Sequence, residues 1–156
     1  MAIWRLILRP VWRAPDFIIG AGRGEVPYLL RWYIIPRNRF FNIYLHKFLR
    51  DDDDRALHDH PWHSLSIGLK GRYKEIMPGR WVMRRPGVPV FRRATHQHRI
   101  VLLTDWKTLA DRPVWTLFIT GPKVRDWGFW CPQGFIPWQR FVDQKDHGAV
   151  GRGCDQ

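Results

Sequence analysis

Apolar and polar residues alternate in short runs along most of the chain, and turn-forming residues separate these runs. The alternation is clearest over residues 72–76 and 114–120, where β-branched and aromatic side chains dominate. A period of two residues is typical of a strand with one buried face. No segment keeps a period of 3.6 residues over three turns, so the pattern does not predict a long helix.

The turns divide the remaining sequence into further strands of regular, short spacing. Lys70-Gly71, Pro78-Gly79 and Pro86-Gly87 each predict a tight connection. Further strands are expected over residues 29–35, 40–48, 65–69, 80–83, 88–91, 98–104 and 126–130. Many short antiparallel strands of this kind predict an all-β barrel or sandwich.

Composition adds a division of the chain into three parts. A chain of 156 residues with 45% apolar residues can bury one substantial core. Residues 1–27 are rich in proline and glycine and predict an irregular N-terminal arm, and residues 28–146 contain the predicted barrel. Residues 147–156 are rich in glycine and polar side chains, so we expect a disordered tail.

The charge and the cysteines restrict partners and location. A net charge of +12 favours a polyanion, a phosphorylated small molecule or an acidic protein surface. The sequence has no nucleic-acid-binding motif, so charge alone supports nucleic acid. Cys131 and Cys154 do not form a disulfide framework and are compatible with a reducing cytosol. We found no signal peptide and no apolar run of about 20 residues, and therefore expect a cytoplasmic protein without a transmembrane segment.

The histidines carry the strongest chemical signal. His58 and His60 are two residues apart, so on an extended segment their side chains share a face and lie ~7 Å apart at the backbone. A second pair with this spacing, His96 and His98, precedes an apolar run, and we favour His98 because it adjoins that run directly. Two such pairs on strands predict a metal site. His63 has the wrong strand parity, but a bulge near Pro61 could re-aim it as a further ligand.

These motifs resemble those of a known family. His58-x-His60, then Ser64 and Gly71, follow the spacing of the first cupin motif, and Pro86-Gly87 with His98 is similar to a loose second motif. Over about residues 40–120 the chain resembles the cupin superfamily of double-stranded β-helix, or jelly-roll, barrels. The segments 57–62 and 121–129 resemble those of uncharacterised bacterial and phage cupin-like proteins.

The resemblance implies a metal site formed by His58, His60 and His98. Ser64 occupies the position of the family's glutamate ligand, so the usual set of three histidines and one carboxylate is incomplete. Three imidazoles suit a divalent transition metal and leave positions open, and Fe, Zn, Ni, Mn and Cu are not distinguished. Cupins often pair as dimers, which is compatible with a homodimer here.

Several other side chains have catalytic, metal-binding or structural interpretations. Tyr73 and Glu75 share one face of a predicted strand and are the candidate catalytic residues, and Glu75 is alternatively a fourth ligand, a group that orients an imidazole, or a surface residue paired with arginine. Asp59 is expected at the surface or capping a loop. His46 is expected to be a hydrogen-bonded core histidine, and the acidic run 51–54 a solvated turn.

The aromatic residues and arginines complete the predicted site. We expect most tryptophans in the core, namely Trp62, Trp81, Trp115, Trp127 and Trp130. Residues 125–129 are the expected pocket wall. Arginines flanking Pro86-Gly87, at positions 84, 85, 92 and 93, are candidates for binding a phosphate or carboxylate of a small anionic ligand, and a solubilising surface is the alternative.

Three function classes follow, and the sequence leaves open whether the protein is an enzyme. The first is a mononuclear metal-dependent oxygenase of the dioxygenase type that acts on a small anionic substrate, with Tyr73 or Glu75 assisting proton transfer. The second is a metal-independent isomerase or epimerase of a sugar phosphate. The third is a non-catalytic, metal-stabilised protein whose basic surface binds nucleic acid or a protein.

Overall fold

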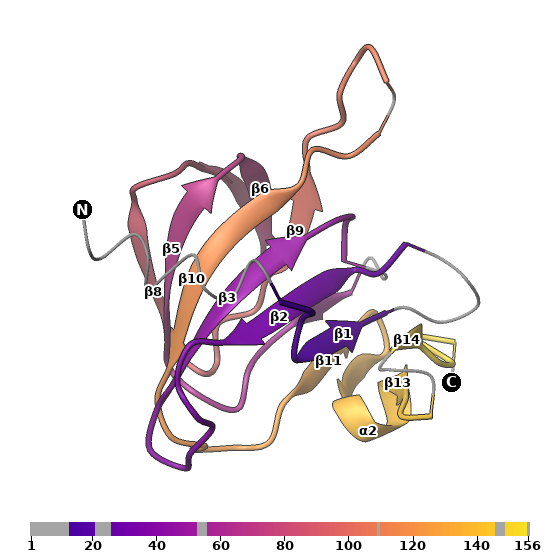
Figure 1. Ribbon diagram of the computed structural model, residues 1–156. Helices are drawn as coiled ribbons and strands as arrows, with labels where there is room; N and C mark the ends of the chain where they lie inside the picture. Colours follow the sequence, from indigo (N-terminus) through magenta and orange to yellow (C-terminus); the bar gives the residue numbers. More distant parts are fainter. Residues whose placement is uncertain (1–12, 21–25, 53–55, 109, 146–148, 156) are drawn as a thin grey trace.

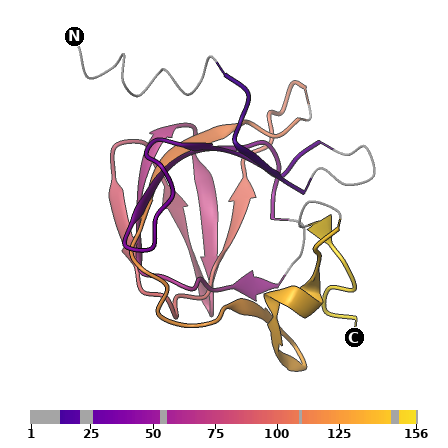
Figure 2. The same cartoon turned by 60° about the horizontal axis from the view of Figure 1, so that its bottom comes forward.

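Two layers of antiparallel strands face each other in a barrel (Figures 1 and 2). The computed structural model describes residues 13–20, 26–52, 56–108, 110–145 and 149–155. Within these ranges the chain is almost entirely β, and the α-helix is limited to one short segment, α2 (Trp138–Phe141). The prediction of an all-β jelly-roll barrel is therefore confirmed.

The first layer is a six-stranded sheet in the order β1-β2-β3-β10-β5-β8. Its strands are β1 (Phe17–Ile19), β2 (Leu29–Tyr33), β3 (Asn42–Phe48), β5 (Ser64–Lys70), β8 (Pro89–Arg92) and β10 (Val114–Thr120). The range of β10 is the one that the alternation predicts, and β10 pairs along its length with both β3 and β5. It therefore forms the middle of this layer.

The second layer consists of two three-stranded sheets. One has the order β7-β6-β9 and comprises β6 (Tyr73–Met77), β7 (Arg80–Arg84) and β9 (Arg99–Leu102). The other has the order β12-β11-β4 and comprises β4 (Leu57–His58), β11 (Gly128–Cys131) and β12 (Gly134–Pro137). A single antiparallel bridge between His58 and His98 connects the two sheets. Two predicted metal ligands thus occupy the junction.

The core lies between the layers. Its main cluster joins residues of both layers, namely Leu29, Phe48, Tyr73, Ile100, Leu102 and Val114. The prediction that most tryptophans fill the core is wrong in part, because Trp81 is 59% exposed and Trp130 37% exposed. Trp81 instead lies under the ammonium group of Lys74, 5.3 Å from the ring centroid. The core is built mainly from aliphatic side chains, Phe and Tyr.

The ends of the chain contribute to the structure within the described residues. β1, which falls in the predicted arm, pairs with β2, whereas residues 1–12 and 21–25 of that arm lie outside the described ranges. In the predicted tail, β14 (Ala149–Val150) pairs with β13 (Val142–Asp143), and Cys154 forms a disulfide with Cys131. Residues 149–155 thus differ from the expectation of a disordered tail, because strand pairing and the disulfide hold them. The boundaries of the three predicted parts stay a prediction.

Figures 1 and 2 show α2, β13 and β14 together on one side of the barrel. This group packs around a second apolar cluster that includes Ile136 and Phe141. No helix among the described residues has the length and apolar character required to cross a bilayer.

The acidic run differs from the expected solvated turn. Asp52 Oδ2 accepts a hydrogen bond from the backbone N of Ile100 at 2.6 Å, and Asp51 Oδ1 accepts one from Leu102 N at 2.5 Å. Both carboxylates therefore lie along the edge of β9 that β6 leaves open. Asp53 and Asp54 lie outside the described residues.

Candidate metal centre

Backbone pairing places His58 opposite His98. The N–H of each residue donates to the carbonyl oxygen of the other, both at 2.9 Å, so the two residues form a reciprocal antiparallel pair. Side chains of such a pair project to the same face of the sheet. The imidazole centroids are 4.9 Å apart. Two ligands from positions 40 residues apart in the sequence are thus positioned by main-chain hydrogen bonds.

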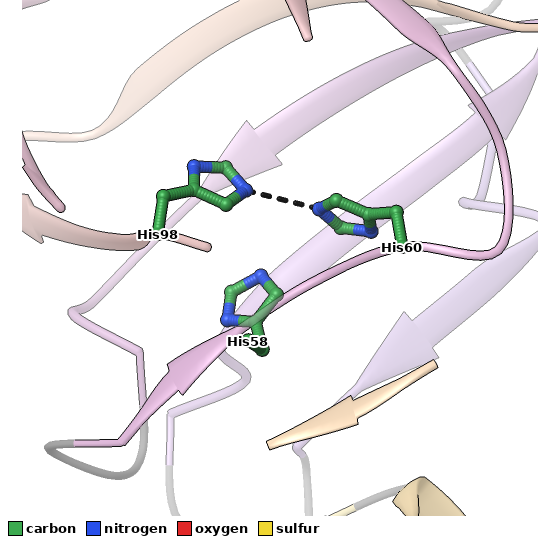
Figure 3. A group of neighbouring side chains, drawn as sticks. All are labelled: His58, His60 and His98. Carbon is green, nitrogen blue, oxygen red and sulfur yellow. Dashed lines mark hydrogen bonds between the residues drawn. The ribbon is translucent and has the colours of Figure 1, made fainter. Parts of the chain in front are cut away.

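His60 completes the cluster (Figure 3). Its backbone N donates to Ala94 O at 3.2 Å, and the parity of the extended segment turns its ring to the side of His58. His60 Nε2 and His98 Nε2 are 3.0 Å apart, and one ring nitrogen from each of the three histidines lies within 4.8 Å of the others. Two imidazole nitrogens bound to one metal at about 2.1 Å and at right angles lie about 3 Å apart, so the spacing fits adjacent positions on an ion.

His60 and His98 are held in the neutral form that binds metals. Burial, together with the neighbouring positive charges and histidines, holds the pKa of His60 well below its ordinary value. Burial also lowers the pKa of His98 to about 3, although its contact with Glu75 opposes the shift. A neutral imidazole has a lone pair free for coordination. At neutral pH these residues therefore require no deprotonation before they bind an ion.

The cluster opens on a cavity of about 640 Å³ between the layers. The cavity is lined mostly by aromatic and aliphatic side chains, among them Trp62, Phe118, Trp127 and Phe129. Trp127 and Phe129 come from the segment 125–129, in which the sequence predicts a pocket wall, and this prediction is confirmed. An apolar cavity with a few polar groups at one point is typical of a site for a small organic ligand.

Glu75 lies behind His98, does not itself line the cavity, and has a fully buried side chain. Glu75 Oε1 is 2.8 Å from His98 Nδ1, in a contact whose direction is poorly aligned for a hydrogen bond. Arg92 Nε and Arg84 Nε donate to the two carboxylate oxygens, each at 2.5 Å, and His96 Nε2 lies 3.3 Å from Oε1. The expectation of a solvent-facing Glu75 is wrong, but its pairing with arginine is present.

The ionisation of Glu75 follows from these partners. Burial raises the pKa of a carboxyl group, but the close contacts with His96, His98 and Arg92 outweigh this effect and hold the pKa of Glu75 well below its usual range. The carboxylate is therefore anionic and fixes the side of His98 that carries Nδ1. This leaves Nε2 directed at the cluster, as expected of a group that orients an imidazole.

The other candidate catalytic residue has a different position. Tyr73 is buried but lines the cavity, and its hydroxyl accepts a hydrogen bond from Arg92 Nη2 at 3.3 Å. Tyr73 and Glu75 thus share one face of β6, as predicted, but only Tyr73 reaches the cavity. Their catalytic roles stay predictions.

The structure leaves His63 outside the cluster. Its side chain is exposed, its ring stacks on Phe91 with centroids 6.1 Å apart, and its Nδ1 accepts a hydrogen bond from Ala94 N. The chain bends at residues 61–62, between His60 and His63, and the cluster does not include His63. Ser64 is buried and does not line the cavity, so it does not replace the family's glutamate.

Two further predicted residues have structural roles. Asp59 points away from its neighbouring histidines and caps the loop before β11, accepting hydrogen bonds from Arg125, Trp130 and the backbone N of Gly128. It is fully buried, so the surface alternative is wrong and the capping alternative is confirmed. His46 is a buried, hydrogen-bonded histidine, as expected, and it also lines the cavity.

The sequence-based interpretation missed two residues of the site. Asp52 Oδ2 lies 3.7 Å from His58 Nδ1, and the acidic run gave no sign of this contact. The second missed residue is Arg31, which also lines the cavity. Of the arginines predicted to bind an anion, Arg84 and Arg92 are already paired with Glu75, and Arg85 and Arg93 are exposed. The sequence feature that could have identified Arg31 is the position of a charged residue inside the apolar run 29–33.

Comparisons with known proteins support the fold. The sequence matches no protein-family model and no curated protein. Among solved structures, the EutQ protein of Clostridium difficile is similar, with a TM-score of 0.53 and 9% identity over 72% of this chain and 82% of that one. The polyketide cyclase RemF of Streptomyces resistomycificus has a TM-score of 0.52 and 15% identity over 72% of this chain and 80% of that one.

Cupin superfamily proteins recur among these structural neighbours. One from Desulfitobacterium hafniense DCB-2 has a TM-score of 0.48 and 15% identity, over 61% of this chain and 78% of that one. At such identities the likeness concerns the fold alone. The strand order and the facing layers show a jelly-roll barrel, and the matches to EutQ and RemF support that fold. Within it, His58, His60 and His98 form a cluster that could hold a metal ion.

Proposed function

We propose that the protein is a metal-dependent cupin enzyme in which His58, His60 and His98 bind one divalent transition metal ion. The observation that carries the proposal is the convergence of three imidazoles on one point in the wall of a 640 Å³ cavity. Three protein ligands leave positions on the ion open to a substrate, which is typical of catalytic rather than structural sites. The reaction we favour is a mononuclear non-haem oxygenase reaction on a small organic anion.

The bound metal would supply Lewis-acid or redox chemistry at the cavity wall. The protein's own residues would orient the substrate and move protons. Trp127, Phe118 and Phe129 form apolar walls that exclude water from the space beside the histidines. Tyr73 accepts a hydrogen bond from Arg92, so its own hydroxyl proton remains free to be donated to a ligand oxygen in the cavity.

Glu75 contributes to the proposed centre through His98. The buried carboxylate holds the Nδ1 side of this imidazole, so the ring cannot turn its Nε2 away from the cluster without losing the contact. Carboxylates placed in this way fix the tautomer of a ligating histidine and increase its basicity. Glu75 is therefore a positioning residue in this proposal, and Tyr73 is the residue that can touch substrate.

The alternative functions have weaker support. A phosphate monoester carries a charge of about −2, whereas Arg84 and Arg92 already donate to Glu75 and the walls near the histidines are aromatic. A non-catalytic protein with a structural metal would have no use for a cavity at that metal. Binding of nucleic acid rests on the net charge of +12 alone.

Metal analysis of protein purified without an affinity tag tests the proposal. We expect close to one transition metal ion per wild-type chain, and loss of that metal in His58→Ala. His63→Ala is a matched control, because it removes an imidazole five residues away that points out of the cluster. Equal metal content in wild type and His58→Ala, or no uptake of added Zn²⁺, Fe²⁺ or Mn²⁺ by wild type, would contradict the proposal.

A further inference from the structure

The cavity contains a second polar point, formed by strands of the opposite layer. Arg31 on β2 and His46 on β3 are directly paired in the sheet register, and both line the cavity. Arg31 Nε donates a hydrogen bond to His46 Nε2 at 2.9 Å, and the guanidinium carbon lies 4.9 Å from the centroid of the Tyr44 ring. Arg31 is thus held in place by a hydrogen bond from its Nε atom to His46 and by contact between its guanidinium group and the Tyr44 ring.

The positive charge of Arg31 has no acidic partner among the residues that the structure describes. His46 does not supply a negative charge, and burial together with the charge of Arg31 holds the pKa of His46 well below its ordinary value. His46 is therefore neutral at physiological pH and acts only as an acceptor for Nε. The four N–H groups on Nη1 and Nη2 make no hydrogen bond within the described ranges, so they are available to a ligand.

Arg92 makes the contrast clear. It also lines the cavity, but its Nε donates to Glu75 at 2.5 Å, and the two opposite charges are buried together. An anion that approached Arg92 would have to compete with an existing carboxylate. Arg31 has no such competitor, so it is the better cation for an incoming anion.

One aromatic ring separates this point from the candidate metal centre. The Phe118 ring stacks on His46 with centroids 5.0 Å apart, and it lies 6.1 Å from the His60 ring. A molecule with a body about one ring long could therefore contact Arg31 at one end and lie beside the histidines at the other.

We propose that Arg31 anchors the carboxylate of a small organic acid whose flat, apolar body lies against Phe118 and extends toward His58, His60 and His98. The planar guanidinium matches a carboxylate in a two-hydrogen-bond geometry, and one unpaired cation balances one negative charge. The aromatic walls favour an aromatic or unsaturated body. The inference rests on the proposed function in that this acid would be the molecule presented to the metal.

Binding of benzoate and cinnamate to the full-length protein tests the inference, with benzamide as the uncharged analogue of the same shape. Each is titrated by calorimetry into protein treated with chelator and into protein loaded with Zn²⁺. We expect both carboxylates to bind in either state and benzamide to bind at least about 10-fold more weakly. The measurement on chelator-treated protein separates the anion site from the metal site.

The decisive variant is Arg31→Met, which keeps an unbranched stem that fills the same space and removes the guanidinium group with its charge. We expect it to weaken binding of the carboxylates about 10- to 100-fold, consistent with the loss of a charge-assisted pair. Arg39→Met makes the same change at an exposed site over Phe40 and should leave binding unchanged. Zn²⁺ uptake should be equal in both variants and wild type.

The outcomes distinguish the two proposals. Carboxylate binding that is absent, equal to that of benzamide, or unaffected by Arg31→Met would overturn the Arg31 inference, even with a full complement of metal. Arg31-dependent binding in a protein that takes up no metal would support the inference and contradict the proposed function. If Arg31→Met does not fold, the Arg31 Nε–H resonance of wild type provides the test, because benzoate must shift it and benzamide must not.

Discussion

His98 has two faces, and the side chains around them differ in charge. On the Nε2 side lie His58 and His60 at the cavity wall, and the pKa values of His60 and His98 are held low by burial. On the Nδ1 side lie Glu75 and His96, neither of which lines the cavity. The two faces belong to one imidazole and are within a few ångströms of each other.

Distance alone does not separate these two groups as metal sites. His58, His60 and His98 have ligand atoms within 4.8 Å of one another, and so have Glu75, His96 and His98. In the second group, however, Arg84 and Arg92 already donate to the carboxylate, whose negative charge is therefore compensated. A metal ion there would have to displace an arginine and would meet its positive charge. The comparison shows that the existing partners of a carboxylate decide whether it can bind an ion.

Among the changes that test this difference between the two groups, replacing Glu75 by glutamine should have the largest effect on stability. The change removes the negative charge between two arginines, and loss of one partner from a buried ion pair costs about 3–5 kcal/mol. We expect a fall of that size in the free energy of unfolding, measured by urea denaturation. Metal stoichiometry should persist with an affinity about 10- to 100-fold weaker, since Glu75 would act only through His98.

Asp126→Asn is the control for the Glu75 variant. It removes the carboxylate of an exposed pair with Lys123, and it should leave both the unfolding midpoint and the metal affinity unchanged. A Glu75→Gln protein that retained the stability of wild type would contradict the view that this carboxylate holds the arginine network together.

The two faces of His98 can be compared directly by removing one histidine from each. We expect His60→Ala to weaken Zn²⁺ binding by about 100-fold or more, since it removes a ligand, and His96→Ala to weaken it less than about 10-fold. Competition with a chromophoric chelator measures both. Equal losses in the two variants would show that the ion binds between the groups, and the reverse order would place it at Glu75.

Acidification should lower the free energy of unfolding, because three histidines are neutral in the folded protein. The pKa values of His46, His60 and His98 are lowered in the folded protein, that of His98 to about 3, whereas an unfolded histidine titrates near about 6.5. Below that pH the unfolded chain binds more protons, so stability falls as the pH falls. Each histidine contributes at most about 1.4 kcal/mol per pH unit.

The measurement is the urea midpoint of metal-free protein at pH 7 and pH 5. The midpoint should be lower at pH 5, and His46→Gln, whose amide does not titrate, should reduce the difference between the two values. A midpoint that is constant or higher at pH 5 would show that these imidazoles are accessible to protons in the folded state.

Local pattern was sufficient to predict the strands that carry the barrel. The alternation over residues 114–120 predicts the whole of β10, and Gly71 meets the requirement of its turn, with φ of +83° and Pro113 O only 2.8 Å from the place of a Cβ. β1 could not be found in this way, because three residues show no period and the strand exists through its pairing with β2. The pairing of Cys131 with Cys154 likewise depends on where two distant segments meet.

The cluster of His58, His60 and His98 could be predicted from the two-residue spacing of the first pair and from the cupin spacing, whereas His63, also predicted as a ligand, lies outside it. Metal binding by these residues stays a prediction. The environment of Glu75 was not predictable, because its arginines come from β7 and β8 through the sheet arrangement. Arg31 was missed because a charged residue in an apolar strand is usually at the surface, and its cavity is formed by segments from both ends of the chain.

The carboxylates of Asp51 and Asp52 have a consequence for association with other chains. An open strand edge offers unpaired N–H groups to any extended segment, which can add itself as a new strand and begin aggregation. On β9 the two N–H groups of Ile100 and Leu102 are already engaged by these carboxylates. Asp52 therefore protects this edge from intermolecular strand addition and also lies beside His58. A change at Asp52 would both expose the N–H group of Ile100 and remove a neighbour of a candidate metal ligand.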